Sequence, residues 1–226
     1  MQQDMILNNK VEIVGTISSD FEFSHSVYGE KFYMFSVEVI RLSHNTDTIP
    51  VTISERVLLG RNFQKRDKVC IAGQYRSYNN YTEVGNKLIL TVFVKDIIHY
   101  SEEYADRHPN AVYLHGFICK PPIFRTTPFG REITDVLLAI NRTYNKSDYI
   151  PCIAWGRNAR FASALEVGER LTVYGRIQSR EYQKRIDENE SIKKTAYEVS
   201  ISKLEIDEIS DAETDIEVDY NCDGKG

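Results

Sequence analysis

The feature of this 226-residue sequence that most limits its possible folds is an internal repeat. The segment DTIPVTISE, residues 47–55, aligns with DYIPCIAWG, residues 148–156, at a shift of 101 residues. The same shift aligns NKVEIVGTI, residues 9–17, with NAVYLHGFI, residues 110–118. A constant register over roughly forty residues indicates two copies of one structural unit.

The repeat divides the chain into four expected regions. A first copy over residues 1–100 is joined to a second copy over residues 111–206 by the polar linker SEEYADRHPN, residues 101–110. Pro109 in this linker helps to end the first copy. Residues 207–226 form an acidic tail, which we expect to be disordered because it is highly charged and poor in apolar residues.

Both copies contain the same order of expected elements. Each opens with an apolar alternation that predicts a strand with one buried face. A second strand follows a turn at YGEK or FGRE, and a third contains the Ile-Pro pair. In the second copy a short helix over RNARFASALEVG then ends at Gly168, and two strands follow, RLTVYGRIQSREY and TAYEVSISKLEI, joined by a polar hairpin loop. This order, with glycines inside the strands, is typical of an OB-fold barrel. We therefore expect an all-β protein with two tandem five-stranded OB barrels, each with one short helix.

The alternation also assigns side chains of the second copy to two faces. Ile150, Cys152 and Ala154 would face the barrel interior, and Tyr149 and Trp155 the opposite side. In the fourth strand the predicted outward residues are Tyr174, Arg176, Gln178, Arg180 and Tyr182. Aromatic rings interleaved with arginines suit single-stranded nucleic acid, because bases stack on rings and guanidinium groups bind phosphates. The complete candidate site is Arg142, Tyr144, Tyr149, Trp155, Arg157, Tyr174, Arg176, Arg180, Tyr182, Lys184 and Arg185, the last two placed in the final hairpin loop.

The second copy resembles the bacterial single-stranded DNA-binding protein family over about 95 residues. The resemblance is carried, in order, by LHGFICKPPIFRTTPFGRE, LLAINRTY, YIPCIAWGR, LEVGERLTVYGRIQSREY and AYEVSISKLE. It implies an OB barrel that binds single strands without strong sequence preference and assembles with four barrels. The family's stacking aromatics fall on Tyr144, Tyr149, Trp155 and Tyr182. Tyrosine stands where tryptophan is common, which implies weaker stacking.

Two features depart from that family. Its members usually carry one barrel per chain, whereas this chain carries two, so we expect a homodimer with four barrels. The family's acidic tail ends in an apolar tip with Pro-Phe that docks onto replication and repair proteins, whereas this sequence ends in Lys225-Gly226. Recruitment of such partners by that route is in doubt.

The first copy has lost the aromatic residues of the second. Ser43, Thr48 and Ser54 stand where the second copy has Tyr144, Tyr149 and Trp155, and the apolar inward set is kept. Tyr75, Tyr78 and Tyr81 with Arg76 remain on its fourth strand for a weaker contact. We expect this copy to serve mainly in assembly and in contacts with the nucleic-acid backbone.

The charge is uneven along the chain. The net charge is −5, but nine acidic residues and one basic residue lie in residues 205–226. Residues 110–204 hold 15 basic and 10 acidic residues, whereas residues 1–109 hold 12 and 14. The second copy is therefore the basic part of the chain, as a nucleic-acid site requires.

Several classes are not indicated by the sequence. It contains no phosphate-binding, zinc-protease or serine-hydrolase motif, so we expect no catalysis, no cofactor and no metal. The four cysteines form no C-x-x-C pair, and no secretory signal or membrane-spanning run is visible, which favours a cytoplasmic, nucleoid-associated protein.

Three functions remain open at this point. The first is sequence-independent binding and protection of single-stranded DNA in replication, recombination or repair. The second is an OB-fold interaction scaffold or accessory replication protein of phage or mobile-element origin, with little DNA binding. The third is RNA binding. No residue here reads a 2′-hydroxyl unambiguously, so the sequence does not distinguish RNA from DNA as the ligand.

Overall fold

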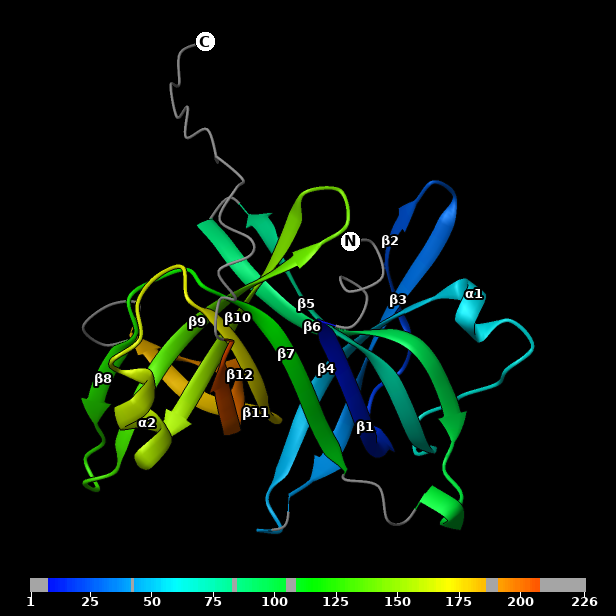
Figure 1. Cartoon of the computed structure of the whole chain (residues 1–226). Helices are drawn as coiled ribbons and strands as arrows, with labels where there is room; N and C mark the ends of the chain where they lie inside the picture. The colour runs from blue at the N-terminus through cyan, green and yellow to red at the C-terminus, as the bar shows by residue number, and fades with distance from the viewer. Residues whose placement is uncertain (1–7, 42, 83–84, 105–108, 186–190, 208–226) are drawn as a thin grey trace.

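The computed structural model describes residues 8–41, 43–82, 85–104, 109–185 and 191–207. Its elements occur in the same order in both copies (Figure 1). The first copy contains β1 (Asn9–Ile17), β2 (Glu22–Val27), β3 (Glu30–Ile40), β4 (Thr46–Ser54), α1 (Glu55–Leu58), β5 (Lys68–Thr82) and β6 (Gly85–His99). After the 3-10 helix η2 (Glu102–Tyr104), the second contains β7 (Asn110–Ile118), β8 (Ile123–Thr126), β9 (Glu132–Arg142), β10 (Lys146–Trp155), α2 (Arg157–Ala162), β11 (Arg170–Arg185) and β12 (Ser191–Ile206). The predicted acidic tail lies outside the described residues except for Asp207.

Each copy closes into a five-stranded barrel. In the first copy β1 pairs with β3 and β5, β3 with β4, β4 in parallel with β6, and β6 with β5. The second copy repeats this circuit with β7, β9, β10, β12 and β11. The expected all-β class and the OB-fold barrels are confirmed.

The core contains the residues of β4 and β10 that the alternation assigned to the barrel interior. Ile150, Cys152 and Ala154 of β10 are at most 2% exposed, and the matching Ile49, Val51 and Ile53 of β4 are fully buried. Glycines sit where two strands approach too closely for a side chain. A Cβ on Gly175 would lie 2.3 Å from the Ser200 carbonyl oxygen, beside a bulge in the β11–β12 ladder. The glycine and the bulge together let the strand bend to close the barrel.

Three details of the expected elements were wrong. β2 and β8 were not expected, because their side chains are almost all exposed and bury no apolar face. The helix expected to reach Gly168 ends at Ala162, and Gly168 lies in a later turn with φ 95°. Asn110 was assigned to the linker but begins β7, where its side-chain amide bonds both the N–H and the carbonyl of Ile177.

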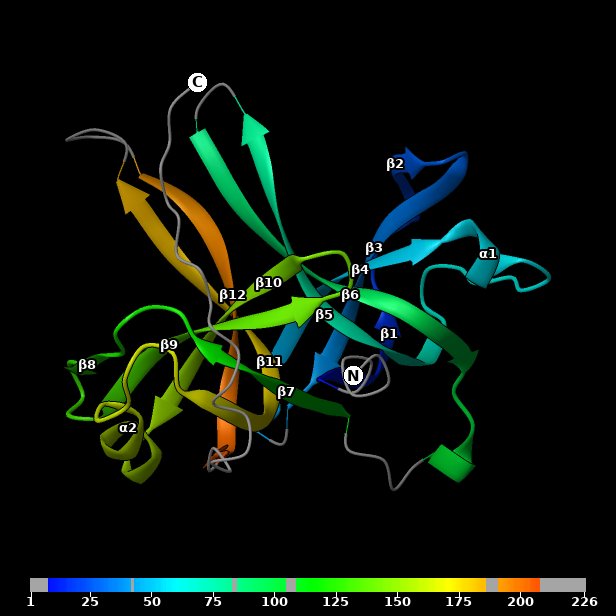
Figure 2. The same cartoon turned by 45° about the horizontal axis from the view of Figure 1, so that its top comes forward.

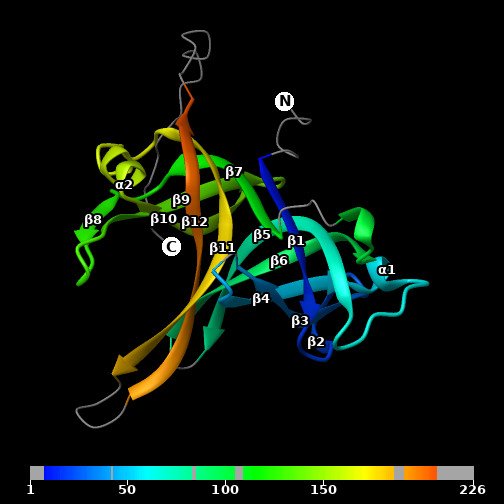
Figure 3. The ribbon, with the colours of Figure 1, turned by 90° about the horizontal axis from the view of Figure 1, so that it is seen from below.

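The two barrels are joined by their first strands. β1 and β7 run antiparallel, with Val11 opposite Val112, so that all twelve strands form one continuous sheet (Figure 3). The pairing relates the copies by an approximate two-fold rotation: Asn9 bonds the backbone of Tyr75 in the first copy as Asn110 bonds Ile177 in the second. Each long hairpin, β5–β6 and β11–β12, extends beyond its own barrel (Figure 2). β5 contacts β10 and β11 contacts β4, so each copy packs on the other.

Candidate nucleic-acid interface

The outward side of β10 displays two of the predicted aromatic residues. The Tyr149 side chain is 45% exposed, while its neighbour Ile150 is fully buried. Trp155 is half-buried, and its indole N–H donates a 3.2 Å hydrogen bond to the Ser200 hydroxyl of β12. Both rings therefore lie outside the barrel interior, as the alternation predicted.

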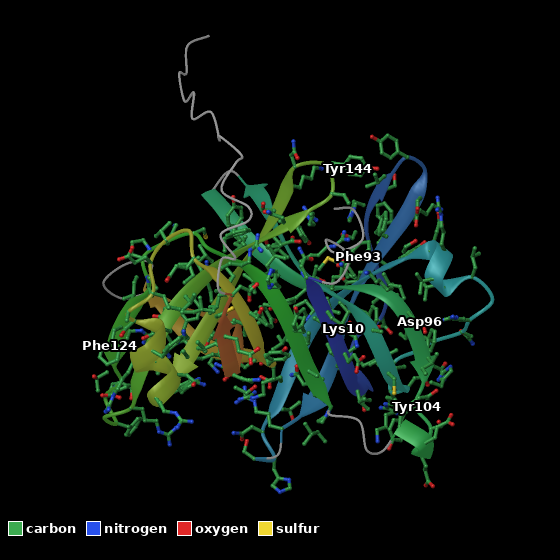
Figure 4. The ribbon with its side chains drawn as sticks, in the orientation of Figure 1. Lys10, Phe93, Asp96, Tyr104, Phe124 and Tyr144 are labelled. Atoms are coloured by element: carbon green, nitrogen blue, oxygen red, sulfur yellow. The ribbon has the colours of Figure 1, made fainter. Side chains whose placement is uncertain are left out.

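The β9–β10 turn displays a third ring. Arg142 pairs with Lys146, so residues 143–145 form the turn, and within it Tyr144 and Asn145 have left-handed φ values of 62° and 52°. This conformation leaves the Tyr144 side chain 92% exposed at the hairpin tip (Figure 4). Figure 4 also places Tyr144 above the junction between the two copies, so this ring can meet a ligand that reaches both.

The predicted residues of β11 are divided between different surroundings. Tyr182 is 38% exposed, and the exposed Arg180 lies 6.0 Å from its ring centroid. Tyr174 packs edge-on against Tyr113 of β7 at 5.3 Å and lies beside Lys203 of β12. Arg180 and Tyr182 thus form one cation–ring pair, and Tyr174 belongs to a separate cluster.

Gln178 was predicted to lie on the outward side of β11, but it is not available to a ligand. It is only 7% exposed, and its amide donates a 2.6 Å hydrogen bond to the Glu198 carboxylate. Although it lies on the outward side of β11, this pairing with β12 buries it.

Arg176 is also not a free cation. Its guanidinium lies 3.4 Å from a carboxylate oxygen of Asp47, which comes from β4 of the other copy. Asp47 is fully buried and accepts a 2.7 Å hydrogen bond from the Ser179 backbone N–H. It also accepts two hydrogen bonds from Arg41. Burial alone would raise the pKa of Asp47, but the hydrogen bonds from Arg41 and Ser179 outweigh burial and lower it.

Asp148 occupies the equivalent position in the second copy but is less well paired. One of its carboxylate oxygens accepts a 2.8 Å hydrogen bond from the Ser77 N–H of β5. The other lies 3.3 Å from Arg142 Nε without making a hydrogen bond among the described residues. Burial is the main cause that raises the pKa of Asp148, and Ser77, Arg142 and Arg76 oppose it only in part. At this equivalent position, the carboxylate of the first copy has all its hydrogen-bonding partners, and that of the second copy lacks some of them.

The remaining predicted cations come from α2 and from the end of β11. Arg157 is exposed at the first position of α2. Lys184 and Arg185 were expected in a hairpin loop, but their backbones continue β11 opposite Ile192 and Ser191. They were misplaced because the β11–β12 ladder extends further than the polar sequence suggested, and their side chains are outside the described part of the structure.

The first copy has a groove that was not predicted by aligning its sequence with that of the second copy. Thr48 is exposed, whereas Ser54 is only 6% exposed and caps α1. Tyr75 was expected to make a weak contact with the nucleic acid. This prediction is wrong, because the Tyr75 side chain is fully buried in the core. The outer sides of β2 to β6 nevertheless form a groove of about 620 Å³, lined by Ser24, His25, Met34, Thr52, Arg76, Ser77, Tyr78, Ile89, Thr91, Phe93 and, from the second copy, Arg142.

Phe93 is the aromatic residue that the sequence comparison overlooked. The parallel pair Thr52–Phe93 occupies the place of Ile153–Ser200 in the second copy. A comparison that extended into the last strand of each copy would have found a ring in place of the Ser200 hydroxyl. The Arg76 guanidinium lies 4.1 Å above the centroid of this ring.

The described part of the chain shows neither a metal-binding cluster nor a membrane-spanning helix. No group of three or more His, Cys, Asp or Glu side chains there is arranged to hold a metal ion. Among the same residues, no helix has the length and apolar character that crossing a membrane requires.

Comparison with known proteins identifies relatives of the second copy. The model of the single-strand binding protein family matches residues 109–207. Single-stranded DNA-binding protein A of Bacillus subtilis is 37% identical over 81 residues, which cover 33% of this chain and 47% of that protein. Single-stranded DNA-binding protein 1 of Staphylococcus aureus is also 37% identical over 81 residues, covering 48% of its length. This chain thus spans about half the length of the curated relatives it matches.

A solved structure extends the likeness in fold to both copies. The wild-type single-stranded DNA binding protein from Thermus aquaticus superposes with a TM-score of 0.68 and 21% sequence identity. The match covers 90% of this chain and 95% of that one. The tandem arrangement of barrels therefore occurs in another solved structure.

Proposed function

Because the single-strand binding protein family model matches residues 109–207, which contain the second copy, we propose that this chain binds single-stranded DNA and protects it. Binding is largely independent of base sequence and involves no catalysis. The scaffold alternative is not favoured, since the relatives matched by the second copy are named for binding single-stranded DNA.

The observation that carries this proposal is the display of aromatic rings on the outside of one barrel. Tyr144, Tyr149 and Tyr182 are 92%, 45% and 38% exposed, and Trp155, on the same strand β10 as Tyr149, is half-buried. An exposed ring is costly in water unless it has a partner, and a base offers it a flat apolar face of matching size. In this proposal these four rings stack bases.

The cations around the rings bind phosphates. Arg157 and Arg180 are exposed and serve this role directly, together with Lys184 and Arg185 at the end of β11. Arg142 binds phosphate at the junction of the copies. Arg176 acts mainly through Asp47, by fixing the first copy against β11, and Tyr174 contributes a more distant contact.

We place the protein in DNA replication, recombination or repair, in the cytoplasm and associated with the nucleoid. Two chains pair to give four barrels, and replication or repair proteins are its further partners. No cofactor or metal is needed, because stacking and charge pairing require neither.

The proposal is tested by fluorescence anisotropy of a labelled oligo(dT). We expect Tyr149→Leu and Tyr182→Leu each to weaken binding by about 1–3 kcal/mol, the range for one base stacked on one ring. Unlabelled oligo(U) should compete less well than oligo(dT). Unchanged affinity in both variants would exclude this face as the site, and stronger competition by oligo(U) would assign the protein to RNA.

A further inference from the structure

The two buried carboxylates at the copy junction differ in how they pair with neighbouring arginines. Arg41 forms two hydrogen bonds with Asp47, and Arg176 approaches the same carboxylate. At the equivalent place, Arg142 approaches Asp148 at 3.3 Å, but its Nε makes no hydrogen bond among the described residues. The first carboxylate is therefore satisfied by hydrogen bonds, whereas the second is paired with a partly exposed Arg142 by charge alone.

Arg76 lies beside this incompletely paired cluster. Its Nη2 donates a 2.8 Å hydrogen bond to Gln74, while its Nε is buried and makes none in the described part of the structure. Burial, and then the charge of Arg142, lower the pKa of Arg76. The charge of Asp148 offsets the repulsion between the two guanidinium groups only in part, so a further anion beside them would be stabilised.

Arg76 and Arg142 both line two adjoining grooves. One is the groove of the first copy described above. The other, of about 550 Å³, lies between the copies and is also lined by Lys95, Tyr144 and Lys146. Among the residues that the structure describes, Asp148 is the only acidic one that lines either groove. This surface therefore favours a ligand that carries negative charge along its length.

The groove of the first copy also offers a ring to a base. Tyr78 is 39% exposed, and its hydroxyl reaches Met34 Sδ at 3.7 Å on the opposite wall. The Phe93 ring packs against the Arg76 guanidinium, and both side chains line the groove. One aromatic face and one oriented cation are the two elements that a nucleotide of a single strand needs.

We propose that a single strand bound to the second copy crosses the junction into the groove of the first copy, with Arg76 and Arg142 holding a phosphate and Tyr78 stacking a base. This inference rests on the proposed function, because the strand must first occupy the second copy. It gives the first copy a direct contact with bases, by residues that differ from those of the second. Phe93 is a positioning residue for Arg76.

Two lengths of oligo(dT) separate this inference from the proposed function. A short oligo(dT) of about 12 nucleotides fits within the roughly 4–16 nucleotides that one OB barrel covers, and one of about 30 extends beyond it. Quenching of Trp155, the only tryptophan, reports the second copy in both titrations. Arg76→Gln and Tyr78→Leu are compared with Lys65→Gln and Tyr28→Leu, which remove an exposed charge and an exposed ring of the first copy that line neither groove.

We expect Tyr78→Leu to weaken binding of the long oligonucleotide about fivefold or more and to leave the short one unchanged. Arg76→Gln should lower the slope of log affinity against log salt by about one for the long oligonucleotide only. The two controls should match the wild type, and unchanged short-oligonucleotide affinity shows that each variant is folded. Wild-type affinity of both groove variants for the long oligonucleotide would overturn the inference and leave the proposed function intact. Failure of wild-type protein to bind the short oligonucleotide would overturn the proposed function itself.

Discussion

At the scale of single residues, aspartates at equivalent positions differ in how well the surrounding groups stabilise their charge. Asp47 and Asp148 are both fully buried and both reach a serine on the other copy. Asp47 receives enough hydrogen bonds to hold its charge, whereas the charge of Asp148 is only partly compensated. A buried carboxylate stabilises a fold only when its partners repay the cost of removing it from water.

This difference predicts opposite responses to pH. The folded-state pKa of Asp47 lies below its ordinary value of 3.8, so its stabilisation is present above that value and is lost as the pH falls through the folded pKa. We expect Asp47→Asn to lower the free energy of unfolding by about 3 kcal/mol at pH 7, as for a broken buried ion pair. The deficit should shrink below about pH 4. Urea unfolding at a series of pH values measures it.

Asp148→Asn is the matched control. The pKa of Asp148 is raised in the folded state, so its ionised form weakens the fold above that pKa, and protonation relieves the cost at lower pH. Asp148→Asn should therefore lower the free energy of unfolding less at pH 7 than Asp47→Asn does. As the pH falls, the Asp148→Asn variant should become less stable relative to the wild type. Equal losses for the two variants across the pH range would contradict this account of the junction.

The exposed ring of Tyr144 gives a second prediction at this scale. Replacing it by leucine should weaken binding of a short oligo(dT) by about 1–3 kcal/mol, because one stacking face is lost. Tyr28→Leu is a close control, since Tyr28 is also fully exposed and also has a positive φ, 50°. Titration of Trp155 fluorescence compares the two, and equal effects would show that Tyr144 makes no special contact.

At the scale of elements, the two barrels depend on close strand crossings. A methyl group on Gly175 would collide with the Ser200 carbonyl at 2.3 Å, so Gly175→Ala should destabilise the protein by about 2–3 kcal/mol, as overpacking does. Gly168→Ala meets no atom within 4 Å and bears only the cost of its φ of 95°, about 1 kcal/mol. Chemical unfolding ranks the two variants, and the reverse order would contradict the barrel geometry.

The sequence predicted those elements that bury an apolar face. The repeat and its alternation located the five strands of each barrel, because buried residues recur at every second position. β2 and β8 were missed since they pair only with β3 and β9 and bury almost nothing. The helix end was misplaced because Gly168 stops a turn that follows α2.

The candidate site was predicted only in part for a similar reason. Tyr144 and Tyr149 are exposed as expected, because their surroundings are set by their own hairpin. The environment of Arg176 depends on Asp47, which is 129 residues away in sequence and comes close only when the copies dock. Phe93 was missed because its place beside Thr52 arises from the parallel strand pair that closes the barrel.

At the scale of the whole molecule, the β1–β7 pairing makes one chain a pair of barrels. A four-barrel assembly then needs two chains. We expect static light scattering to give about twice the mass of the 26.1 kDa chain at micromolar concentration. A mass equal to that of one chain under these conditions would refute the proposed dimer.

The central claim is that the second copy displays its rings and cations for unpaired bases. The most direct measurement is titration of the wild-type protein with a short oligo(dT), followed by Trp155 fluorescence at several salt concentrations. We predict saturable quenching, with an affinity that falls steeply as salt rises because phosphate contacts release counterions. No quenching at low salt, or quenching that is independent of salt, would contradict the claim.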